Sequence, residues 1–356
     1  MGNYFLGIDV GSTKSHALIA DETGRVLGIG VGGAGNYEGV GCSGYQAVLH
    51  EITGQALQSA GIPRSEIAAA GFGISGYDWP AERTLIREGI AALGLGCPVK
   101  IANDTIIGLK AGAPQGWGVA LVAGTGTNCY GLDANGREAH ITGAGMLFGE
   151  FGGGIDIAWK TLHCIGYAWT RRGPQTRLTD ALVHHLGAKH PADLLEGLAL
   201  GRYRVGAEIA PLVFDVARAG DRAARDVITW LARELAFSAL GVIRQLALDT
   251  AAFDLVLIGG IFNGGELLLH PLEREIRKAA PGVRFTRLTA PPAIGGVLLA
   301  MEAMEEDERI PCKSVYRRLT QTAITVFAGT ELGGSLPPGS HDTASAGIGA
   351  SESGCV

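Results

Sequence analysis

The stretch "GIDVGSTKSHALI", Gly7–Ile19, places an aspartate and a small polar turn between two apolar runs. The runs at 4–10 and 15–20 have the composition of strands, and a third run at 25–31 follows the turn "DETG". Short turns between successive strands predict a meander. The first turn, "GST", is either an ordinary hairpin turn, which Gly, Ser and Thr favour, or a small anion site made by backbone amides and hydroxyl groups.

The same pattern returns further along the chain. From residue 118, "GVALVAGTGTNCYGLDANGREAHITG" again has the order strand, Gly-Thr turn, strand, Asp-x-x-Gly-Arg turn and strand. With an ungapped offset, four residues of the first copy have identical counterparts in the second: Thr13 and Thr125, Asp21 and Asp133, Gly24 and Gly136, and Arg25 and Arg137. Two copies of one pattern predict two related domains rather than a solenoid, which needs more repeats.

The remaining hydrophobic periodicity predicts alternating helices and strands. Between the meanders we expect a helix at 45–60, a strand at 68–75, a helix at 81–93, a strand at 99–104 and a helix that begins near "TIIGLKAGA". After the second meander we expect helices at about 150–164, 178–187, 204–218, 221–248, 264–280 and 290–304, with strands at 253–260 and 283–288. This alternation is typical of α/β domains.

The second meander and the last expected helix set the domain boundaries. We expect domains at 1–117 and 118–308, the second with a helical insertion and with a last helix that is a candidate to pack on the first domain. Residues 309–356 are rich in Gly, Ser, Ala and Pro and bury little. We therefore expect a mostly disordered tail, in which "TAITVFAG" could add a short strand.

Composition limits the class of protein. With 356 residues, of which 47% are hydrophobic, the chain is long and apolar enough for two globular domains. The net charge of −6 gives no general attraction for nucleic acid. A basic leader, a run of about 20 apolar residues and a G-x-x-x-x-G-K-[ST] motif are all absent from the sequence. We expect a cytoplasmic protein without a membrane span that is not a P-loop NTPase.

Two turns and one aspartate after a strand are candidates for phosphate chemistry. Asp9 precedes the "GST" turn and could hold magnesium through water, because Mg2+ prefers few carboxylates and keeps its waters. The turn in "AGTGTN" (123–128) repeats the Gly-Thr turn, so the two turns could hold a polyphosphate from both sides of a cleft. Asp104, after the strand "VKIAN", is either a helix N-cap or a base that accepts a proton from a substrate hydroxyl during phosphoryl transfer.

Three glycine-rich segments are candidates for ligand contacts. "GGAGNYEG" offers Asn36 and Tyr37, and asparagine can donate to and accept from sugar hydroxyls, although a surface loop is equally compatible. In "GAGMLFGEFGGG" (143–154), Glu150 either binds a polar ligand group or favours the start of the next helix. "LIGGIFNGG" (257–265) has a Gly-Gly turn that would let a flat base approach the backbone, or it is a strand-to-helix loop.

These segments follow the order of one known family. "GIDVGSTKSHALI", "IAND", "VAGTGTNC", "GEFGGG", "LIGG" and "PPAIGGVLLA" together resemble the N-acetylglucosamine kinase branch of the BadF/BadG/BcrA/BcrD-type ATPases, within the sugar kinase, Hsp70 and actin superfamily. The resemblance covers about residues 3–306. It implies two ribonuclease H-like (actin-like ATPase) domains that flank a nucleotide cleft. It also implies a kinase that uses ATP and Mg2+ to phosphorylate the 6-hydroxyl of an amino sugar. We further expect a homodimer.

The resemblance assigns roles to individual positions. Asp104 matches the catalytic base, and Asp9 would help to place magnesium. The positions that would contact ATP are Gly11, Ser12, Thr13, Lys14, Gly124, Thr125, Gly126, Gly259 and Gly260, the last two near the adenosine. The positions that would line the sugar are Asn36, Tyr37, Asp104, Thr127, Asn128, Gly143, Ala144, Gly145 and Glu150.

The sequence departs from the family pattern at Glu150, where the kinases often have aspartate, so the choice between N-acetylglucosamine, glucosamine and another amino sugar stays open. Two other functions are alternatives. An ATPase that activates a partner dehydratase would hold an iron–sulfur cluster between subunits, for which Cys129 and Cys164 are the plausibly placed thiols. A sugar sensor without catalysis would not need a base at Asp104.

Overall fold

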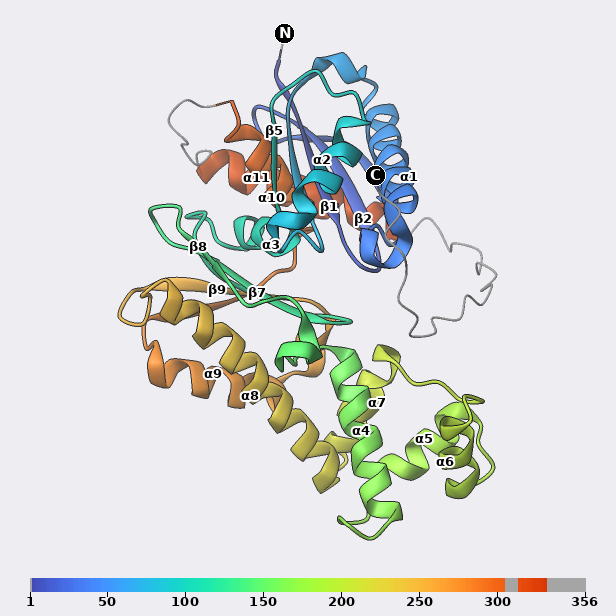
Figure 1. Ribbon diagram of the computed structural model, residues 1–356. Coiled ribbons are helices and arrows are strands. Elements are labelled where there is room, and N and C mark those ends of the chain that lie inside the picture. The colour runs from blue at the N-terminus through green and yellow to red at the C-terminus, as the bar shows by residue number, and fades with distance from the viewer. Residues whose placement is uncertain (1, 305–312, 332–356) are drawn as a thin grey trace. The chain divides into compact units, whose positions relative to one another are not determined.

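The computed structural model describes residues 2–304 and 313–331 (Figure 1). The chain divides into two compact units. Unit 1 contains the described residues up to Asp104 together with those from Ala290 onward, and unit 2 contains Thr105–Thr289. Unit 1 is therefore built from two separate parts of the chain, whereas unit 2 is continuous. The division falls earlier in the chain than the boundary expected at the second meander.

Unit 1 is built on a mixed five-stranded sheet. Its strands are β1 (Tyr4–Val10), β2 (Ser15–Asp21), β3 (Val26–Gly32), β4 (Ile67–Ile74) and β5 (Val99–Asn103). The order across the sheet is β3-β2-β1-β4-β5, in which β1, β2 and β3 form an antiparallel meander. β4 is parallel to β1, and β5 is parallel to β4. The first expected meander and the two later strands are confirmed.

Helices cover both faces of this sheet. The helices of unit 1 are α1 (Tyr37–Ala60), α2 (Arg83–Ala91), α10 (Ala293–Met301) and α11 (Lys313–Glu331). α1 packs on β2 and β3, and its Leu49 and Ile52 share a core with Leu6 and Ile8 of β1. α2 packs on α1, and α10 packs on β1 and β4.

Glycines under α10 let this helix approach the sheet closely. A Cβ at Gly7 would lie 2.3 Å from the Val297 nitrogen, and a Cβ at Gly71 would lie 2.1 Å from the Gly296 carbonyl oxygen. Neighbouring residues along a strand face opposite sides of the sheet, so Gly7 points away from the side that α1 covers. The last expected helix is therefore present, and it packs on the sheet of unit 1.

α11 corrects the expectation of a mostly disordered tail. Lys313–Glu331 are helical, and "TAITVFAG" is part of this helix rather than a strand. The sequence carried a sign of this helix, because Leu319, Ala323 and Phe327 recur every four residues. Leu319 and Ala323 are buried. Residues 332–356, which were also assigned to the tail, lie outside the described residues.

Unit 2 repeats the strand topology of unit 1. Its strands are β6 (Gly118–Ala123), β7 (Thr127–Leu132), β8 (Glu138–His140), β9 (Phe253–Ile258) and β10 (Val283–Arg287). The order is β10-β9-β6-β7-β8, which from its other end matches unit 1 strand for strand. Here too the first three strands form an antiparallel meander and the last two run parallel to the first. The expected internal repeat is confirmed.

The Asp-x-x-Gly-Arg turns of the two copies have the same hydrogen bonds. In each turn the aspartate nitrogen donates to the arginine carbonyl oxygen. In each, the aspartate carboxylate accepts from the arginine nitrogen and from the nitrogen two residues after the aspartate. The glycine has a φ of 82° at Gly24 and 79° at Gly136, a left-handed conformation that glycine adopts without strain. The identities between the copies therefore have a structural cause.

Among the described residues, seven α-helices belong wholly or mostly to unit 2, and the first of them, α3, begins at the last residue of the first part of unit 1. They are α3 (Asp104–Gly112), α4 (Gly154–Trp169), α5 (Leu178–Leu186), α6 (Pro191–Ala199), α7 (Ala210–Arg218), α8 (Arg222–Gln245) and α9 (Glu266–Ala279). α6 was not among the expected helices, and α4 to α7 pack on one another as the helical insertion. None of the helices in the described part of the chain has the length and apolarity needed to cross a membrane.

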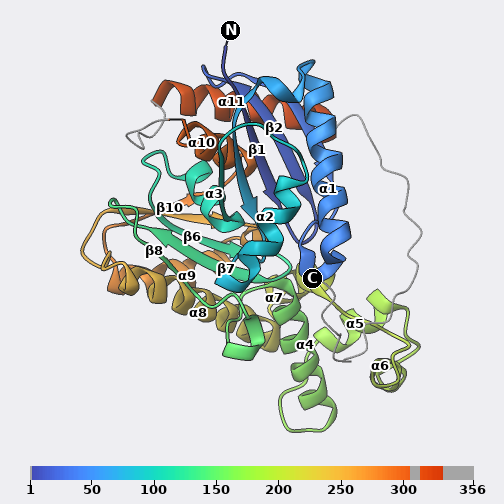
Figure 2. The same cartoon turned by 45° about the horizontal axis from the view of Figure 1, so that its top comes forward.

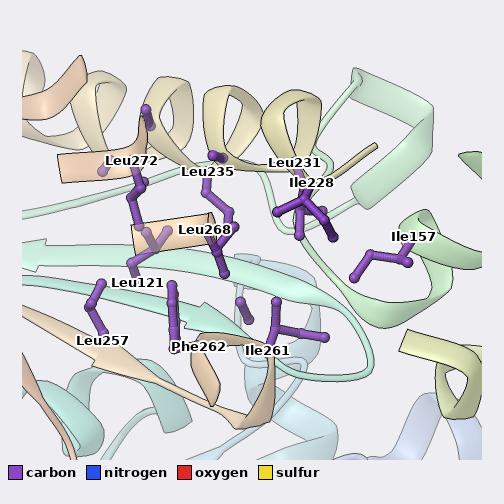
Figure 3. Close-up of a cluster of buried hydrophobic side chains, with 14 of the residues drawn as sticks. Leu121, Ile157, Ile228, Leu231, Leu235, Leu257, Ile261, Phe262, Leu268 and Leu272 are labelled. Atoms are coloured by element: carbon purple, nitrogen blue, oxygen red, sulfur yellow. The ribbon is translucent and has the colours of Figure 1, made fainter. Parts of the chain in front are cut away.

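The core of unit 2 lies between its sheet and α8 and α9. Figure 3 shows Leu231 and Leu235 of α8 and Leu268 of α9 converging on Leu121 of β6. These four leucines are buried. This packing fixes the sheet, and with it the turns at the strand ends that carry the expected ligand contacts.

Candidate functional site

The turn Gly11–Lys14 joins β1 to β2 and exposes its polar groups. The Gly11 nitrogen donates to the Lys14 carbonyl oxygen at 3.1 Å, and the Gly35 nitrogen donates to the Gly11 oxygen at 3.0 Å. Ser12, Thr13 and Lys14 are exposed, whereas the strand residues on both sides of the turn are buried. The turn is therefore held by its backbone while its hydroxyls and its lysine stay available to an anion.

Asp9 lies on β1 directly opposite His16 on β2. Its side chain is 13% exposed, and Asp9 Oδ2 is 3.8 Å from His16 Nδ1. Within the described residues no group of three or more His, Cys, Asp and Glu side chains could hold a metal ion. A single, partly exposed carboxylate beside a turn with exposed polar groups fits Mg2+, which keeps several waters and is held in part by substrate phosphates.

Asn36 links the Gly11–Lys14 turn to α1. Its Oδ1 accepts from the Glu38 nitrogen at 3.0 Å and so caps α1. Its Nδ2 donates to Glu38 Oε2 at 3.1 Å and, more weakly, to Ser12 Oγ at 3.5 Å. The Ser12 hydroxyl lies 3.2 Å from the Ser75 hydroxyl. The helix-cap and expected ligand roles of Asn36 are thus compatible, because the cap places its amide beside the Gly11–Lys14 turn.

Tyr37 follows the cap residue and faces an acidic group. Burial, together with the negative charges of Glu82 and Glu38, raises the pKa of the Tyr37 phenol. A hydrogen bond with Glu82 adds to the effect. Glu82 also accepts from the Asp78 and Trp79 nitrogens. Tyr37 therefore keeps its proton at neutral pH, and its hydroxyl can take part in a network of polar groups.

Asp104 stands at the same edge of the unit 1 sheet as the Gly11–Lys14 turn. β1, β4 and β5 are parallel, so their carboxyl ends meet at one edge. Asp104 is half-buried directly after β5, and it begins α3. The neighbouring Asn103 donates to Asp78 Oδ1 at 3.0 Å.

Ser75 and Asp78 were missed in the sequence. They lie in "SGYD", directly after the buried strand β4. The signal was the same as for Asp104, namely polar side chains just after a buried strand. The neighbouring Gly76 has a φ of 82°, and a Cβ there would lie 3.0 Å from Asn36 Oδ1, so the loop requires glycine at that position.

The second Gly-Thr turn, Gly124–Gly126, is bound to the start of α4. The Gly124 nitrogen donates to the Gly126 oxygen at 2.9 Å. The carbonyl oxygens of Gly124 and Thr125 accept from the Gly154 and Ile155 nitrogens at 2.8 and 3.1 Å. Thr125 and Gly126 are exposed. This turn is thus anchored through its carbonyls, which leaves its exposed side to a ligand.

Gly259 and Gly260 lie next to this second turn. Gly259 has a φ of 110°, and a Cβ there would lie 2.3 Å from the Ala123 carbonyl oxygen. Both glycines are exposed. The structure therefore brings "LIGG" and "AGTGTN" together within unit 2, as a nucleotide site made of backbone would require.

Glu150 has one carboxylate oxygen without a partner. Its Oε1 accepts from the Thr142 nitrogen at 2.6 Å, whereas Oε2 is buried and has no hydrogen-bond partner in the part of the chain that the structure describes. A buried acceptor without a partner costs free energy, which a ligand hydroxyl would recover. Glu150 also lies close enough to Cys129 to affect the pKa of that thiol.

The loop before Glu150 is shaped by glycines. Gly143 and Gly145 have φ values of 75° and 56°, and the Gly145 oxygen accepts from the Glu150 nitrogen at 2.9 Å. Ala144 lies between them, and its nitrogen donates to Thr142 Oγ1 at 3.3 Å. Gly143, Ala144, Gly145 and Glu150 are therefore brought together in unit 2.

Thr127 and Asn128 begin β7 and are partly engaged with the backbone. Thr127 Oγ1 donates to the Val122 oxygen at 2.9 Å, and Asn128 Oδ1 accepts from the Cys129 nitrogen at 2.8 Å. Both side chains are half-buried. Their backbone bonds fix their orientation at the start of the strand, just after the Gly124–Gly126 turn.

Cys129 and Cys164 do not have the character of metal thiolates. Burial, and secondarily the charge of Glu150, raises the pKa of the Cys129 thiol. Burial also raises the pKa of the Cys164 thiol. Since iron–sulfur ligation needs the thiolate, both environments disfavour it.

Two known kinases are similar to this chain in sequence. The chain is 28% identical over 303 residues to the N-acetylmuramic acid/N-acetylglucosamine kinase of Clostridium acetobutylicum, an alignment that covers 83% of this chain and 98% of that protein. It is 27% identical over 313 residues to the N-acetyl-D-glucosamine kinase of Dictyostelium discoideum, with 84% and 98% covered.

A solved structure shares the fold. It is that of a Chromobacterium violaceum protein proposed to be an N-acetylglucosamine kinase, with a TM-score of 0.66, 22% identity, and 83% of this chain and 98% of that chain covered. The model of the BadF/BadG/BcrA/BcrD ATPase family matches residues 6–300, which include both Gly-Thr turns and Asp104. The chain therefore belongs to the BadF/BadG/BcrA/BcrD ATPase family.

Proposed function

We propose that this chain is an ATP-dependent sugar kinase that phosphorylates the 6-hydroxyl of an amino sugar, N-acetylglucosamine or glucosamine, with Asp104 as general base. Both sequence relatives named above are kinases of N-acetylated amino sugars, and they align with most of the chain. The family is one of ATPases, which supports ATP as the phosphoryl donor.

One observation carries the proposal. Asp9 and the Gly11–Lys14 turn at the end of β1, and Asp104 after β5, lie at the carboxyl edge of the unit 1 sheet, with the parallel strand β4 between β1 and β5. Phosphoryl transfer needs groups that bind the phosphates and a base for the acceptor hydroxyl, and the residues at this edge are of the types suited to both roles. A protein that only binds sugar would need neither.

The residues of unit 1 would divide the reaction between them. The Asp104 carboxylate would accept the proton of the sugar hydroxyl as its oxygen bonds to the terminal phosphorus and the bond from phosphorus to the ADP oxygen breaks. Ser12, Thr13 and Lys14 would hold the terminal phosphate with the Gly11 turn. Asp9 would bind the waters of Mg2+. Bound with ATP, Mg2+ neutralises charge that develops on the phosphates.

Unit 2 would contribute the remaining contacts. We propose that Gly124, Thr125 and Gly126 contact the phosphates and that Gly259 and Gly260 lie against the adenosine. The residues proposed to line the sugar are Asn36, Tyr37, Thr127, Asn128, Gly143, Ala144, Gly145 and Glu150. The unpaired Glu150 Oε2 supports this assignment, because a sugar hydroxyl could donate to it.

We also propose that the enzyme is a cytoplasmic homodimer. This proposal follows the resemblance to the kinase branch of the family. Light scattering of the full chain after gel filtration would give the mass of the assembly. A mass of one chain, near 36.8 kDa, at micromolar concentration would contradict the dimer.

The test is ADP release in the presence of a panel of amino sugars. N-acetylglucosamine, glucosamine and N-acetylmuramic acid are compared at equal concentration, and phosphorus NMR of the product locates the phosphate. We expect a 6-phosphate. Asp104→Asn should lower kcat about 1,000-fold, as the loss of a general base does. The exposed Asp249→Asn, far along the sequence in unit 2, is the matched control and should retain activity.

Two results would contradict the proposal. If no sugar stimulates ADP release, the kinase assignment fails, and sugar-independent ATP turnover would favour the partner-activating ATPase. If Asp104→Asn turns over normally while its melting temperature equals that of the wild type, the base assignment fails. Sugar binding without ATP turnover would favour the sensor.

A further inference from the structure

α11 lies outside the region that the family model matches. The match ends at residue 300, whereas α11 spans Lys313–Glu331. Within unit 1, α11 lies beside α10 (Figure 2). It also contacts β3. Arg318 Nη1 donates to Thr23 Oγ1 at 2.9 Å, and the Val26 nitrogen donates to Thr322 Oγ1 at 3.2 Å. α11 is therefore attached to the β2–β3 hairpin by specific hydrogen bonds.

The far end of α11 reaches His16. The Phe327 and His16 rings meet edge to face, with centroids 5.1 Å apart and an interplanar angle of 83°. His16 is 7% exposed. Such a contact limits rotation of the imidazole, because the ring has no room to turn against a packed aromatic neighbour.

The His16 imidazole lies close to the Asp9 carboxylate without a hydrogen bond between them. His16 Nδ1 is 3.8 Å from Asp9 Oδ2, beyond hydrogen-bond distance. In the described part of the chain His16 Nδ1 has no hydrogen-bond partner. A buried ring nitrogen without a partner is costly, and a small movement of the Asp9 carboxylate would satisfy it.

The second copy of the repeat lacks this pair. The position of Asp9 in β1 corresponds to Val122 in β6, and the cross-strand partner of Val122 is Asn128. A histidine paired across the strands with a carboxylate is therefore found at this position only in the first copy, which carries Asp9, the proposed magnesium ligand. This is the pattern in which a hydrogen-bond donor behind a metal-binding carboxylate orients it.

We propose that His16, held by Phe327 of α11, is the positioning residue for Asp9. In the tautomer that carries hydrogen on Nδ1, the imidazole donates to Asp9 Oδ2 and fixes the other carboxylate oxygen toward the waters of Mg2+. α11, outside the matched family region, thereby sets the affinity of the site for Mg·ATP. The inference rests on the proposed role of Asp9.

The experiment measures equilibrium binding of a fluorescent ATP analogue as Mg2+ is varied, without sugar. His16→Ala should weaken the Mg2+-dependent part of binding about 10-fold, and Phe327→Ala should weaken it in the same direction by less. His16→Asn, which places the residue of the second copy here, should restore part of the loss through its amide donor. Ile324→Ala, on the exposed side of α11, is the control and should bind like the wild type.

Steady-state kinetics distinguish a loss of Asp9 positioning from a general loss of folded structure. His16→Ala should raise KM for Mg·ATP and leave KM for the sugar unchanged, with a melting temperature near that of the wild type. If Mg2+-dependent binding is unchanged in His16→Ala, or if Ile324→Ala equals Phe327→Ala, the inference is wrong. Asp9→Asn separates the two proposals. If only Asp9→Asn weakens binding, the inference fails and the metal assignment stands; if it too has no effect, both fail.

Discussion

The two Gly-Thr turns have the same place in their meanders but differ in the cross-strand pair of residues next to them. Both join the first two strands of an antiparallel meander, and both meanders continue into the same Asp-x-x-Gly-Arg turn. Behind the first turn the cross-strand pair is Asp9 and His16, and behind the second it is Val122 and Asn128. The two copies thus share their strands and turns, and the difference in this one pair places a carboxylate, that of Asp9, beside the first turn only.

The turns also differ in how they are held. The first is closed by its own Gly11–Lys14 hydrogen bond and by Gly35, whereas the second, one residue shorter, is tied to the start of α4. Turns of similar sequence are therefore held by different hydrogen bonds. Four experiments test whether the two turns differ as proposed.

The largest effect is expected at Asp9. Asp9→Asn should lower kcat/KM for Mg·ATP about 100-fold, because the site loses its carboxylate for the metal waters. Val122→Ala, at the matched position of the second copy, should stay close to wild type. Steady-state kinetics with Mg·ATP varied at saturating sugar would measure both. Equal losses at the two positions would mean that the copies are functionally alike, which contradicts the asymmetry.

A smaller effect, on stability, is expected from the turn glycines. A Cβ at Gly11 would lie 2.7 Å from the Lys14 carbonyl oxygen, whereas a Cβ at Gly124 would meet nothing within 4 Å. Gly11→Ala should therefore cost about 2 kcal/mol of unfolding free energy, as crowding a packed site does, and Gly124→Ala should cost much less. Urea unfolding of each variant is the measurement. A larger cost at Gly124 would contradict the account of how the turns are held.

The turn threonines test whether the two copies hold one ligand. Thr13→Ala and Thr125→Ala should each lower kcat/KM for ATP about 10-fold, the loss of roughly one hydrogen bond to a charged group. The double variant should lose less than the product of the two, because groups that act on one ligand are not additive. Strictly multiplicative losses would indicate that the turns act independently.

The smallest effect is expected in the pH dependence of stability. Burial alone would raise the pKa of Asp21, but hydrogen bonds from Thr23 and Arg25 and the charge of Arg318 hold it below its ordinary value of 3.8. The pKa of Asp133 is also below its ordinary value, mainly because the Arg137 side chain donates a hydrogen bond to its carboxylate. A lowered folded-state pKa adds stability above the unfolded value, and this stability is lost as pH falls through the folded value.

Asp21→Asn and Asp133→Asn should therefore each destabilise the protein near neutral pH and reduce its further loss of stability below about pH 4. Urea midpoints at neutral pH and at about pH 3 would measure the difference between each variant and the wild type. A variant that loses as much stability with acid as the wild type would show that its carboxylate is not the group responsible.

Much of the fold could be predicted from local sequence. The meanders follow from short apolar runs and turn residues, and the strand bounds of unit 1 differ from those expected by a single residue at most. The ungapped offset fits β2 and β7, since Ser15 and Thr127 are the first residues of those strands. It fails by one residue for β1 and β6, because the second turn is shorter. The local sequence pattern does not show that the second turn is one residue shorter than the first.

The parts that were missed depend on distant packing. Ser75 and Asp78 lie beside Ser12 and Asn103 because β4 lies between β1 and β5, and the order of parallel strands is set by tertiary contacts. α11 was obscured by the Gly- and Ser-rich residues that follow it, although its four-residue apolar period was present. Composition over a long window thus hid a short amphipathic helix. The roles assigned to Asp104 and to the sugar-lining residues stay predictions.

The glycines beneath α10 have a consequence for biosynthesis. Gly7 and Gly71 leave room on one face of the unit 1 sheet for the close approach of α10, and α10 is synthesised after all of unit 2. A nascent chain can therefore complete unit 2 as a continuous segment while the first sheet waits with one face uncovered. The part of unit 1 up to Asp104 is thus synthesised before unit 2, and the part from Ala290 onward is synthesised after it. Chaperones that bind exposed apolar sheets would meet this protein during that interval.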